Sequence, residues 1–424
     1  MLFIMMKILQ INNVYPDGST GKITADIHHL LLLRGCQSYV CYGRGPRVSE
    51  ENVTKICSEA YAKCNVLESE ITGVPYGGCL LSTARLLRII RKLKPDVVHL
   101  QCINEHFVNI YRLVAWLNRQ RIPTVVTLHA EFLYTGNCGH AFECEKWKTG
   151  CGDCPRPRAA TRSLWFDRTH ENFLHMQAAF SGFDSLLRIV AVSPWIESRA
   201  KMSPILRDKQ YSVIYNGLNT DVFCYRECHR KELFPGCAGQ KVILHVTAFF
   251  SDREDDPKGG SYIIRLARQW QEQNILVAVA GRYKISSDNI PSNLVFLGAV
   301  TDQTKLARYY CAADLTVIAS KRESYSMVCA ESLCCGTPVV GFQAGAPETI
   351  SLPGYSEFIP YGDCAGLQRC AEKWLRKAET LDKKEIARAA AHMYSREKMI
   401  DQYEALYREL LDSKRKRMDT SGVI

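Results

Sequence analysis

Short apolar runs alternate with amphipathic helical segments along this chain, in two successive sets. The runs of the first set lie at residues 6–14, 38–43, 95–101, 123–129, 186–193 and 211–217. Those of the second set lie at residues 241–247, 275–281, 293–298, 314–320 and 338–342. Runs without polar alternation predict strands buried on both faces, and the helical segments between them predict parallel sheets covered by helices. We therefore expect an α/β chain with two doubly wound, Rossmann-like domains facing a cleft, a natural place for a ligand.

The 424 residues of the chain are enough for two domains, and irregular stretches mark the expected limits. The expected parts are an N-terminal domain at 1–217 with a Cys-rich insertion at 130–186, a linker at 218–240, a C-terminal domain at 241–393, a helix at 394–412 that returns to the N-terminal domain, and a basic disordered tail at 413–424. The insertion interrupts the alternation, which is typical of a functional loop.

The charge balance narrows the class of partner. The chain has 54 Lys and Arg against 44 Asp and Glu, a net charge of +10. This excess favours anionic partners such as nucleotides or phospholipid headgroups, and no basic-aromatic stripe indicates nucleic acid. No apolar run reaches the ~18 residues of a membrane helix, and no cleavage site follows the apolar start. We expect a cytoplasmic protein whose 19 cysteines are mostly reduced or bind metal.

Two glutamates, Glu323 and Glu331, carry the strongest functional signal. They have seven residues between them, in a segment that reads as strand, loop, helix and strand. Ligands of open parallel sheets bind at the carboxyl ends of the strands. Carboxylates at that edge accept hydrogen bonds from hydroxyl groups. A sugar and a ribose are therefore the expected ligands.

Four segments, in the same order along the chain, resemble the retaining glycosyltransferases of family 4, which have the GT-B fold. Glu323, Glu331 and the following CGTPVVGF are similar to the family's E-x7-E signature, and VIYNGLNTDVF at 213–223 is similar to its interdomain segment. Lys258 with Gly259 is similar to its phosphate-binding lysine, and TLHA, which ends at Ala130, to its TLHD. The Cys-rich insertion resembles a subgroup that builds bacterial exopolysaccharides, colanic-acid-type transferases among them.

The resemblance assigns roles to these residues. It implies that Glu331 accepts both ribose hydroxyls of a nucleotide, that Glu323 contacts the donor sugar, and that Lys258 binds the diphosphate. It also places His129 beside the donor sugar. Gly259 is expected to allow close approach of the backbone to the donor. Backbone N–H groups are expected to bind the donor at Tyr325, Ser326, Met327 and Gly345. A loop facing the same cleft, against donor phosphate or acceptor, is expected at Gly18, Ser19, Thr20 and Gly21.

The sequence departs from the family at two positions. Ala248 stands about where the family has a phosphate-binding arginine, and Arg253 or Arg282 is expected to supply the second positive charge. Ala130 stands in place of the family's aspartate, with Glu131 next. The first departure, at Ala248, bears on the phosphate part of the site.

The insertion contains four closely spaced thiols, Cys138, Cys144, Cys151 and Cys154. The final C-x2-C pair with two more cysteines is able to hold a structural zinc, and His140 is an alternative ligand. The other interpretations are reduced thiols, or disulfides, which the cytoplasm disfavours. The position of this loop after His129 suggests acceptor recognition.

The expected function is metal-independent, retaining hexosyl transfer from a nucleotide-diphosphate sugar to a glycan, with no cofactor required. The acceptor is expected to be lipid-linked, because the helix at 84–96 interleaves cations with Leu and Ile and could attach to the anionic inner face of the cell membrane. The pattern favours the other interpretation over direct insertion: an ordinary Rossmann helix, apolar toward its sheet and with a solvated basic face. The alternatives for function are a nucleotide-sugar epimerase of the same fold and a weakly catalytic donor-binding assembly subunit.

Overall fold

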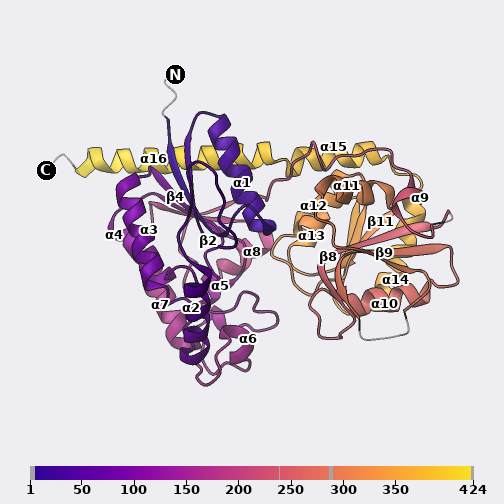
Figure 1. The fold of residues 1–424 in the computed structure, drawn as a ribbon, viewed down its shortest axis with the longest axis horizontal. Helices are drawn as coiled ribbons and strands as arrows, with labels where there is room; N and C mark the ends of the chain where they lie inside the picture. Colours follow the sequence, from indigo (N-terminus) through magenta and orange to yellow (C-terminus); the bar gives the residue numbers. More distant parts are fainter. Residues whose placement is uncertain (1–4, 238, 286–289, 422–424) are drawn as a thin grey trace. The chain divides into compact units, whose positions relative to one another are not determined.

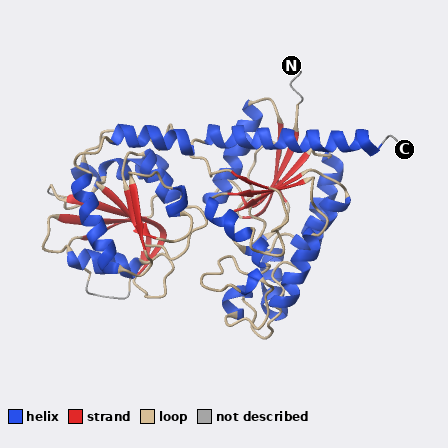
Figure 2. Ribbon diagram, turned by 180° about the vertical axis from the view of Figure 1, so that it is seen from behind, coloured by secondary structure: helices blue, strands red, loops and turns tan. Residues whose placement is uncertain are grey.

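The computed structural model describes residues 5–237, 239–285 and 290–421. The chain divides into two compact units: unit 1 is Met1–Tyr215 with Met399–Ile424, and unit 2 is Asn216–Lys398. The boundary therefore falls within the segment that resembles the interdomain motif. Each unit contains one parallel sheet between two layers of helices (Figures 1 and 2).

The sheet of unit 1 has seven strands in the order β3-β2-β1-β4-β5-β6-β7. The bounds of its strands are β1 Lys7–Val14, β2 Gln37–Arg44, β3 Val53–Lys55, β4 Val97–Leu100, β5 Thr124–Leu128, β6 Leu187–Ala191 and β7 Tyr211–Val213. Ile8 of β1 lies beside Ser38 on one side and Val97 on the other, both in parallel register. The direction of strand order reverses between β1 and β4, so loops leaving these two strands diverge and open a ligand-sized gap at the sheet edge.

Helices cover both faces of this sheet. Their bounds are α1 Gly18–Leu33, α2 Glu59–Thr72, α3 Leu80–Leu93, α4 Ile110–Arg119, α5 Phe132–Thr135, η1 Lys146–Lys148, α6 Pro157–Thr161, α7 Thr169–Phe180, α8 Pro194–Ala200 and α16 Arg396–Ser421. Apolar residues of α1 and of α16 pack together on one face, while α3, α4 and α7 lie side by side on the other (Figure 1).

Unit 2 repeats the design with six strands in the order β10-β9-β8-β11-β12-β13. The bounds of its strands are β8 Lys241–Ser251, β9 Ile275–Lys284, β10 Leu294–Gly298, β11 Leu315–Ile318, β12 Val339–Phe342 and β13 Ser356–Ile359. Its helices are α9 Arg230–Leu233, α10 Gly260–Gln269, α11 Gln303–Ala312, α12 Met327–Cys334, α13 Pro347–Ile350, α14 Cys364–Lys377 and α15 Lys383–Tyr394. The reversal of strand order here lies between β8 and β11.

The fold prediction is confirmed, and several boundaries differ from the expected ones. Residues 218–240 belong to unit 2, where Arg230 of α9 donates to Asp314 with both terminal nitrogens, at 2.8 and 2.6 Å. Strands β8 and β9 are longer than the apolar segments that predicted them. Their ends continue to pair with each other as a two-stranded ribbon. The expected disordered tail is helical as far as Ser421, in keeping with its Lys- and Arg-rich composition, and residues 422–424 lie outside the described part.

Several elements lacked a sequence signal. Half of the residues of α2 are polar, and β3 and β13 are short edge strands without an apolar run. Helices α5, α6 and α7 lie in the insertion and α9 in the expected linker, where the sequence pattern was irregular. Among the described residues, no helix combines the length and apolar character that crossing a membrane requires.

Candidate active site

In unit 2, two segments meet at the reversal of strand order. Gly259, the residue before α10, has φ +74°, and a Cβ there would lie 2.2 Å from the carbonyl oxygen of Ala319. A Cβ on Gly260 would lie 2.1 Å from the oxygen of Ser251. Only glycine at these positions lets the loop after β8 approach the end of β11 this closely. The amide of Lys321 donates to the oxygen of Pro257 at 2.8 Å and fixes the contact.

This approach brings together two of the predicted residues. Lys258 Nζ lies 2.7 Å from Glu323 Oε1, with the two side chains 41% and 20% exposed. A partly exposed ion pair contributes at most about 1 kcal/mol to stability. The pair therefore matters for position: it holds a cation and a carboxylate side by side at the carboxyl edge of the sheet.

The backbone of Glu323 is tied to the segment after β12. Its amide donates to the oxygen of Ala344 at 2.9 Å, and its own oxygen accepts from Ala346 at 3.1 Å. The amide of Gly345, predicted to face the donor, instead donates to Glu348 Oε1 at 2.8 Å. Glu348 also accepts from Ala344 at 3.0 Å, so it fixes this segment to the first turn of α13.

Helix α12 presents Glu331 and begins at a strained residue. Ser326, its N-cap, has φ +130°, a conformation that side-chain-bearing residues rarely adopt, and such strain gathers at functional sites. The first amides of the helix, at Met327 and after, have no intrahelical acceptor and suit an anion. Tyr325 anchors this end by donating from its hydroxyl to the oxygen of Asn216 at 3.0 Å.

Glu331 has a partner that the sequence did not reveal. Tyr310, fully buried on α11, donates its hydroxyl to Glu331 Oε2 at 3.0 Å. Burial raises the pKa of Tyr310 well above its ordinary value, and the charge of Glu331 raises it further. The phenol therefore stays protonated and orients the carboxylate. In the sequence, the tyrosines at 309–310 have the pattern of buried helix residues. Nothing in that pattern indicates that Tyr310 contacts Glu331.

The two candidates for the missing phosphate arginine differ in their surroundings. Arg253 is exposed and bonds in bidentate fashion to Asp255, at 2.8 and 2.7 Å. Its charge is therefore already compensated. Arg282 lies on β9 opposite Phe249, one residue from Ala248, and has no ion pair among the described residues. Of the two, Arg282 has the less compensated charge among the described residues.

In unit 1, His129 directly follows β5 and joins an uncharged network. Its Nε2 lies 2.8 Å from Gln101 Oε1, and Gln101 donates to Gln10 at 3.2 Å. Beneath them His99, fully buried, bonds through Nε2 to Thr127 at 2.8 Å and through Nδ1 to Tyr407 of α16 at 2.7 Å. Burial lowers the pKa of His129 to about 4 and that of His99, with a smaller contribution from His129, to about 3. Both rings are therefore neutral at pH 7.

Residues Gly18–Gly21, expected as a loop, are instead the first turn of α1. A Cβ on Gly21 would lie 3.0 Å from the carbonyl carbon of Pro16, and the hydroxyl of Thr20 donates to Asn13 at 3.3 Å. These contacts join the helix start to the end of β1, while the first-turn amides remain without intrahelical acceptors. The same unit therefore has a helix N-terminus at its own strand-order reversal.

The four cysteines of the insertion line one cavity of about 20 Å³. Burial raises the pKa of Cys138 and Cys151 to about 12, so these thiols are protonated at pH 7. Within the described ranges, no three His, Cys, Asp or Glu side chains are arranged to hold a metal ion. Zinc at this segment stays a prediction: near-stoichiometric zinc in the purified protein would support it, and its absence would reject it.

Glu131, which follows Ala130, is held by side chains of the same unit. It is fully buried, and Arg199 donates to its Oε2 from Nη2 at 2.9 Å. His140, the alternative zinc ligand, lies 3.7 Å from its Oε1. Burial acts to raise the pKa of Glu131, but His140 and Arg199 together hold it below the ordinary value. This carboxylate therefore joins α8 to the insertion.

Comparison with known proteins identifies the class. A model described as glycosyltransferase family 4 matches residues 21–222, and one described as glycosyl transferases group 1 matches residues 240–377. The putative colanic acid biosynthesis glycosyl transferase WcaC of Escherichia coli K12 is 23% identical, over 96% of this chain and all of that protein.

Solved structures agree with this assignment of the fold. Sucrose-phosphate synthase from Thermosynechococcus elongatus has a TM-score of 0.65 at 16% identity, covering 96% of this chain and 100% of that one. HepE from Anabaena, in complex with UDP-glucose, has a TM-score of 0.60 at 16% identity, covering 95% and 99%. The fold is GT-B, and the protein is a glycosyltransferase. It belongs to the family 4 glycosyltransferases.

Proposed function

We propose that this enzyme transfers a hexose, with retention of anomeric configuration, from a nucleotide-diphosphate sugar to a bacterial surface polysaccharide under construction. The observation that carries the proposal is the meeting of Lys258 with Glu323 at the strand-order reversal of unit 2, close along the chain to Glu331 on α12. A cation for phosphate and two carboxylates for hydroxyl groups are the groups that such a donor requires.

In this proposal Glu331, oriented by Tyr310, accepts both ribose hydroxyls. Glu323 contacts the sugar, and the amides that open α12 at Ser326 and Met327 bind diphosphate oxygens. Lys258, with Arg282, stabilises the charge that develops on the leaving diphosphate. His129, neutral because of its burial, donates or accepts a hydrogen bond to the sugar without adding charge.

The proposed reaction takes place on one face of the sugar. The acceptor hydroxyl oxygen bonds to the anomeric carbon as the bond from that carbon to the phosphate oxygen breaks. The acceptor's proton passes to the departing phosphate, and a nucleoside diphosphate leaves. The positive charge of Lys258 then serves where another enzyme would use a divalent cation, so we propose that transfer is metal-independent.

The relatives support the direction of the proposal. The relative from Escherichia coli is named for colanic acid biosynthesis, and HepE is described with UDP-glucose bound. We propose a polysaccharide acceptor carried on a membrane lipid for this chain too, with the enzyme at the inner face of the cell membrane. The exposed cations of α3 support attachment to an anionic surface.

The test is a thermal-shift screen of nucleotide sugars, because a bound donor raises the apparent stability. The best donor is then incubated with glycan acceptors, with and without EDTA, and the anomeric configuration of the product is read by NMR. Transfer with retention, unchanged by EDTA, is expected. Epimer formation from the donor alone would indicate the epimerase, and donor binding without turnover would indicate the assembly subunit.

A further inference from the structure

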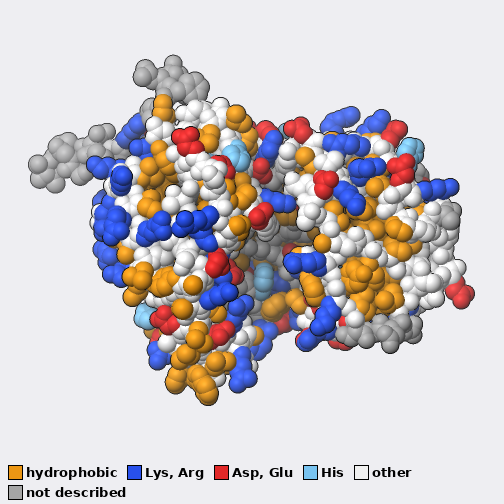
Figure 3. Space-filling view, in the orientation of Figure 1, with side chains coloured by type: hydrophobic (Ala, Val, Ile, Leu, Met, Phe, Trp, Pro, Cys, Tyr) orange, Lys and Arg blue, Asp and Glu red, His pale blue; other side chains and the backbone are white. Residues whose placement is uncertain are grey.

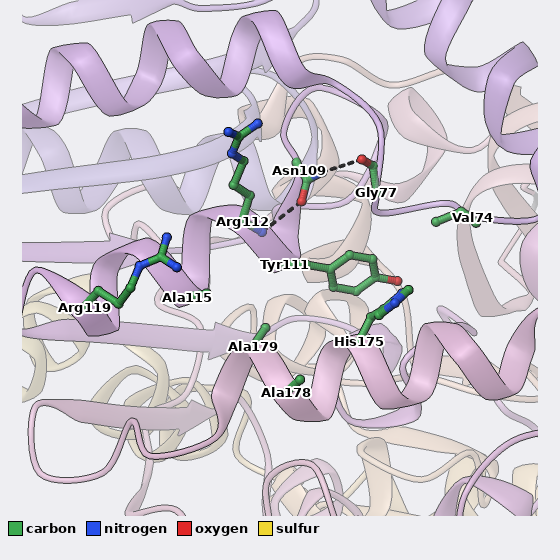
Figure 4. Close-up of a pocket in the computed structure, with 10 residues that line it drawn as sticks. All are labelled: Val74, Gly77, Asn109, Tyr111, Arg112, Ala115, Arg119, His175, Ala178 and Ala179. Atoms are coloured by element: carbon green, nitrogen blue, oxygen red, sulfur yellow. Dashed lines mark hydrogen bonds between the residues drawn. The ribbon is translucent and has the colours of Figure 1, made fainter.

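A groove in unit 1 lies away from the residues discussed so far, between α4, α7 and the loop that follows α2. It has a volume of about 700 Å³ (Figure 4). Small residues create it: Ala115 of α4 stands across from Ala178 and Ala179 of α7, and Val74 of the loop lies at one end. A volume of this size accommodates a small organic ligand and exceeds what one phosphate group fills.

The groove contains a polar group that lacks a partner. The hydroxyl of Tyr111 is fully buried and makes no hydrogen bond within the described residues. Its ring lies beside His175 of α7, with centroids 5.5 Å apart, and Figure 4 shows the two side chains next to each other. A buried hydroxyl without a hydrogen-bond partner is destabilising, so a small movement of Tyr111 that lets a ligand bond to this hydroxyl is favourable.

Two cations lie along the same groove. Arg112 and Arg119 are exposed, and neither has an ion pair in the described ranges. They are seven positions apart on α4, which places them on one face of the helix two turns apart. The described lining residues include no acid. The groove therefore combines an apolar floor with an uncompensated positive rim.

Further cations lie on the neighbouring helix α3. Helix α3 packs beside α4 and exposes Arg85, Arg88, Arg91 and Lys92, with Arg91 stacked 5.4 Å from the Trp116 ring of α4. Figure 3 shows blue side chains gathered on this part of unit 1. A negatively charged surface would meet cations both in the groove and beside it.

We infer that this groove binds the phosphate-bearing head of an anionic membrane lipid. Arg112 and Arg119 hold the phosphate, and the alanine floor covers the start of the hydrocarbon. The hydroxyl of Tyr111 donates to an ester or glycerol oxygen once its side chain turns into the groove. A free glycan fits less well, because its many hydroxyls would meet alanine and valine side chains. The inference adds a specific lipid site to the proposed membrane attachment, and it stands or falls separately from sugar transfer.

The test is flotation of the full chain with phosphatidylcholine vesicles, with or without phosphatidylglycerol. Wild type is expected to bind only the anionic vesicles. Arg112→Gln with Arg119→Gln should bind about thirtyfold more weakly, since each cation near an anionic membrane contributes about fivefold. Ala178→Leu fills the groove without changing charge, and it should bind as weakly as that double variant.

A matched control removes two other arginines. Arg369→Gln with Arg376→Gln also deletes two exposed cations seven positions apart on one helix, α14, and should bind like wild type. Each variant is first checked for an unchanged thermal midpoint. The inference is overturned if Ala178→Leu and the groove double variant bind like the control.

A free phosphate ester is distinguished with glycerol 3-phosphate. If this soluble probe raises the thermal midpoint through Arg112 and Arg119 while the anionic vesicles do not bind, the groove serves a soluble anion and the lipid inference is wrong. Failure of vesicle binding with sugar transfer intact would reject the lipid site and leave the proposed function standing.

Discussion

The two units share one strand order and use its reversal point in opposite ways. In unit 2 the loops after β8 and β11 bring charged groups together, Lys258 and Glu323 at 2.7 Å. In unit 1 the residues that follow β4 and β5 are Gln101 and His129, which are uncharged and bonded to each other. The same backbone architecture thus presents an ionic edge in one unit and a neutral edge in the other.

The difference teaches how each edge is maintained. The ionic pair of unit 2 is partly exposed and depends on glycine at positions 259 and 260, where any Cβ would clash. The neutral edge of unit 1 depends on burial, which keeps His99 and His129 unprotonated. We therefore expect loss of a charged side chain to impair the function of unit 2, and acid to lower the stability of unit 1.

The largest effect is expected from Glu323→Gln. The change removes the carboxylate that we place on the donor sugar and leaves its shape, so turnover should fall by about a hundredfold, the size of effect seen when one transition-state contact is lost. The donor-induced thermal shift should persist. Steady-state kinetics and thermal shift together measure this, and undiminished turnover would break the assignment of the ionic edge to the chemistry.

As the pH falls, unit 1 should lose stability before unit 2. Burial lowers the folded-state pKa of His28 to about 4 and of His99 to about 3, and both lie in unit 1, whereas unit 2 has His245 at about 4. A lowered histidine pKa gives stability that is complete above the unfolded value of about 6.5 and declines as pH falls towards the folded value. At full protonation the shift of His28 corresponds to roughly 3 kcal/mol and that of His99 to roughly 5 kcal/mol.

Hydrogen exchange at pH 7 and pH 5 measures this order. Peptides from β4 and β5 should lose protection at pH 5 more than peptides from β8 and β11. Equal loss in the two units, or earlier loss in unit 2, would contradict the contrast between a buried neutral edge and an exposed ionic one.

Arg282→Gln should weaken donor binding by about tenfold, since a hydrogen bond between charged groups contributes about 1.5 kcal/mol. Arg253→Gln is the matched control, because Asp255 already compensates that guanidinium. The KM for the donor is the quantity to compare. If Arg253→Gln has the larger effect, the phosphate contact lies in the loop after β8 and not on β9.

The smallest expected effect is that of Tyr310→Phe. It removes the hydroxyl that donates to Glu331 at 3.0 Å and keeps the buried ring. Donor affinity should fall about fivefold, the value of one hydrogen bond of about 1 kcal/mol, with turnover at saturating donor unchanged. A fall in turnover with unchanged affinity would show that Tyr310 acts beyond Glu331.

The fold was predictable because it depends on patterns local to the chain. Apolar runs and helical segments of ordinary length define β8, β11 and α12, and the reversal of strand order follows from the architecture. The contact of Lys258 with Glu323 joins residues 65 positions apart. The motifs suggested that both belong to one site, whereas only the structure shows that they pair.

The residues that escaped prediction share a physical reason. Tyr310 is a buried aromatic in a helix, and its role depends on which side chain its hydroxyl meets. The amide of Gly345 donates to Glu348 and not to the expected donor ligand. The sequence does not show which of these two acceptors the amide meets. The sequence does not distinguish Arg253 from Arg282 as a phosphate-binding cation. They differ in the structure because Asp255 bonds to Arg253.

The central claim is that unit 2 holds the donor at its ionic edge. Hydrogen exchange of the full chain, with and without the nucleotide sugar that gives the largest thermal shift, tests it most directly. The account predicts new protection at residues 256–260 and 323–331 in wild type, and its loss in Glu331→Ala. Protection confined to peptides of unit 1, or unchanged in Glu331→Ala, would contradict it.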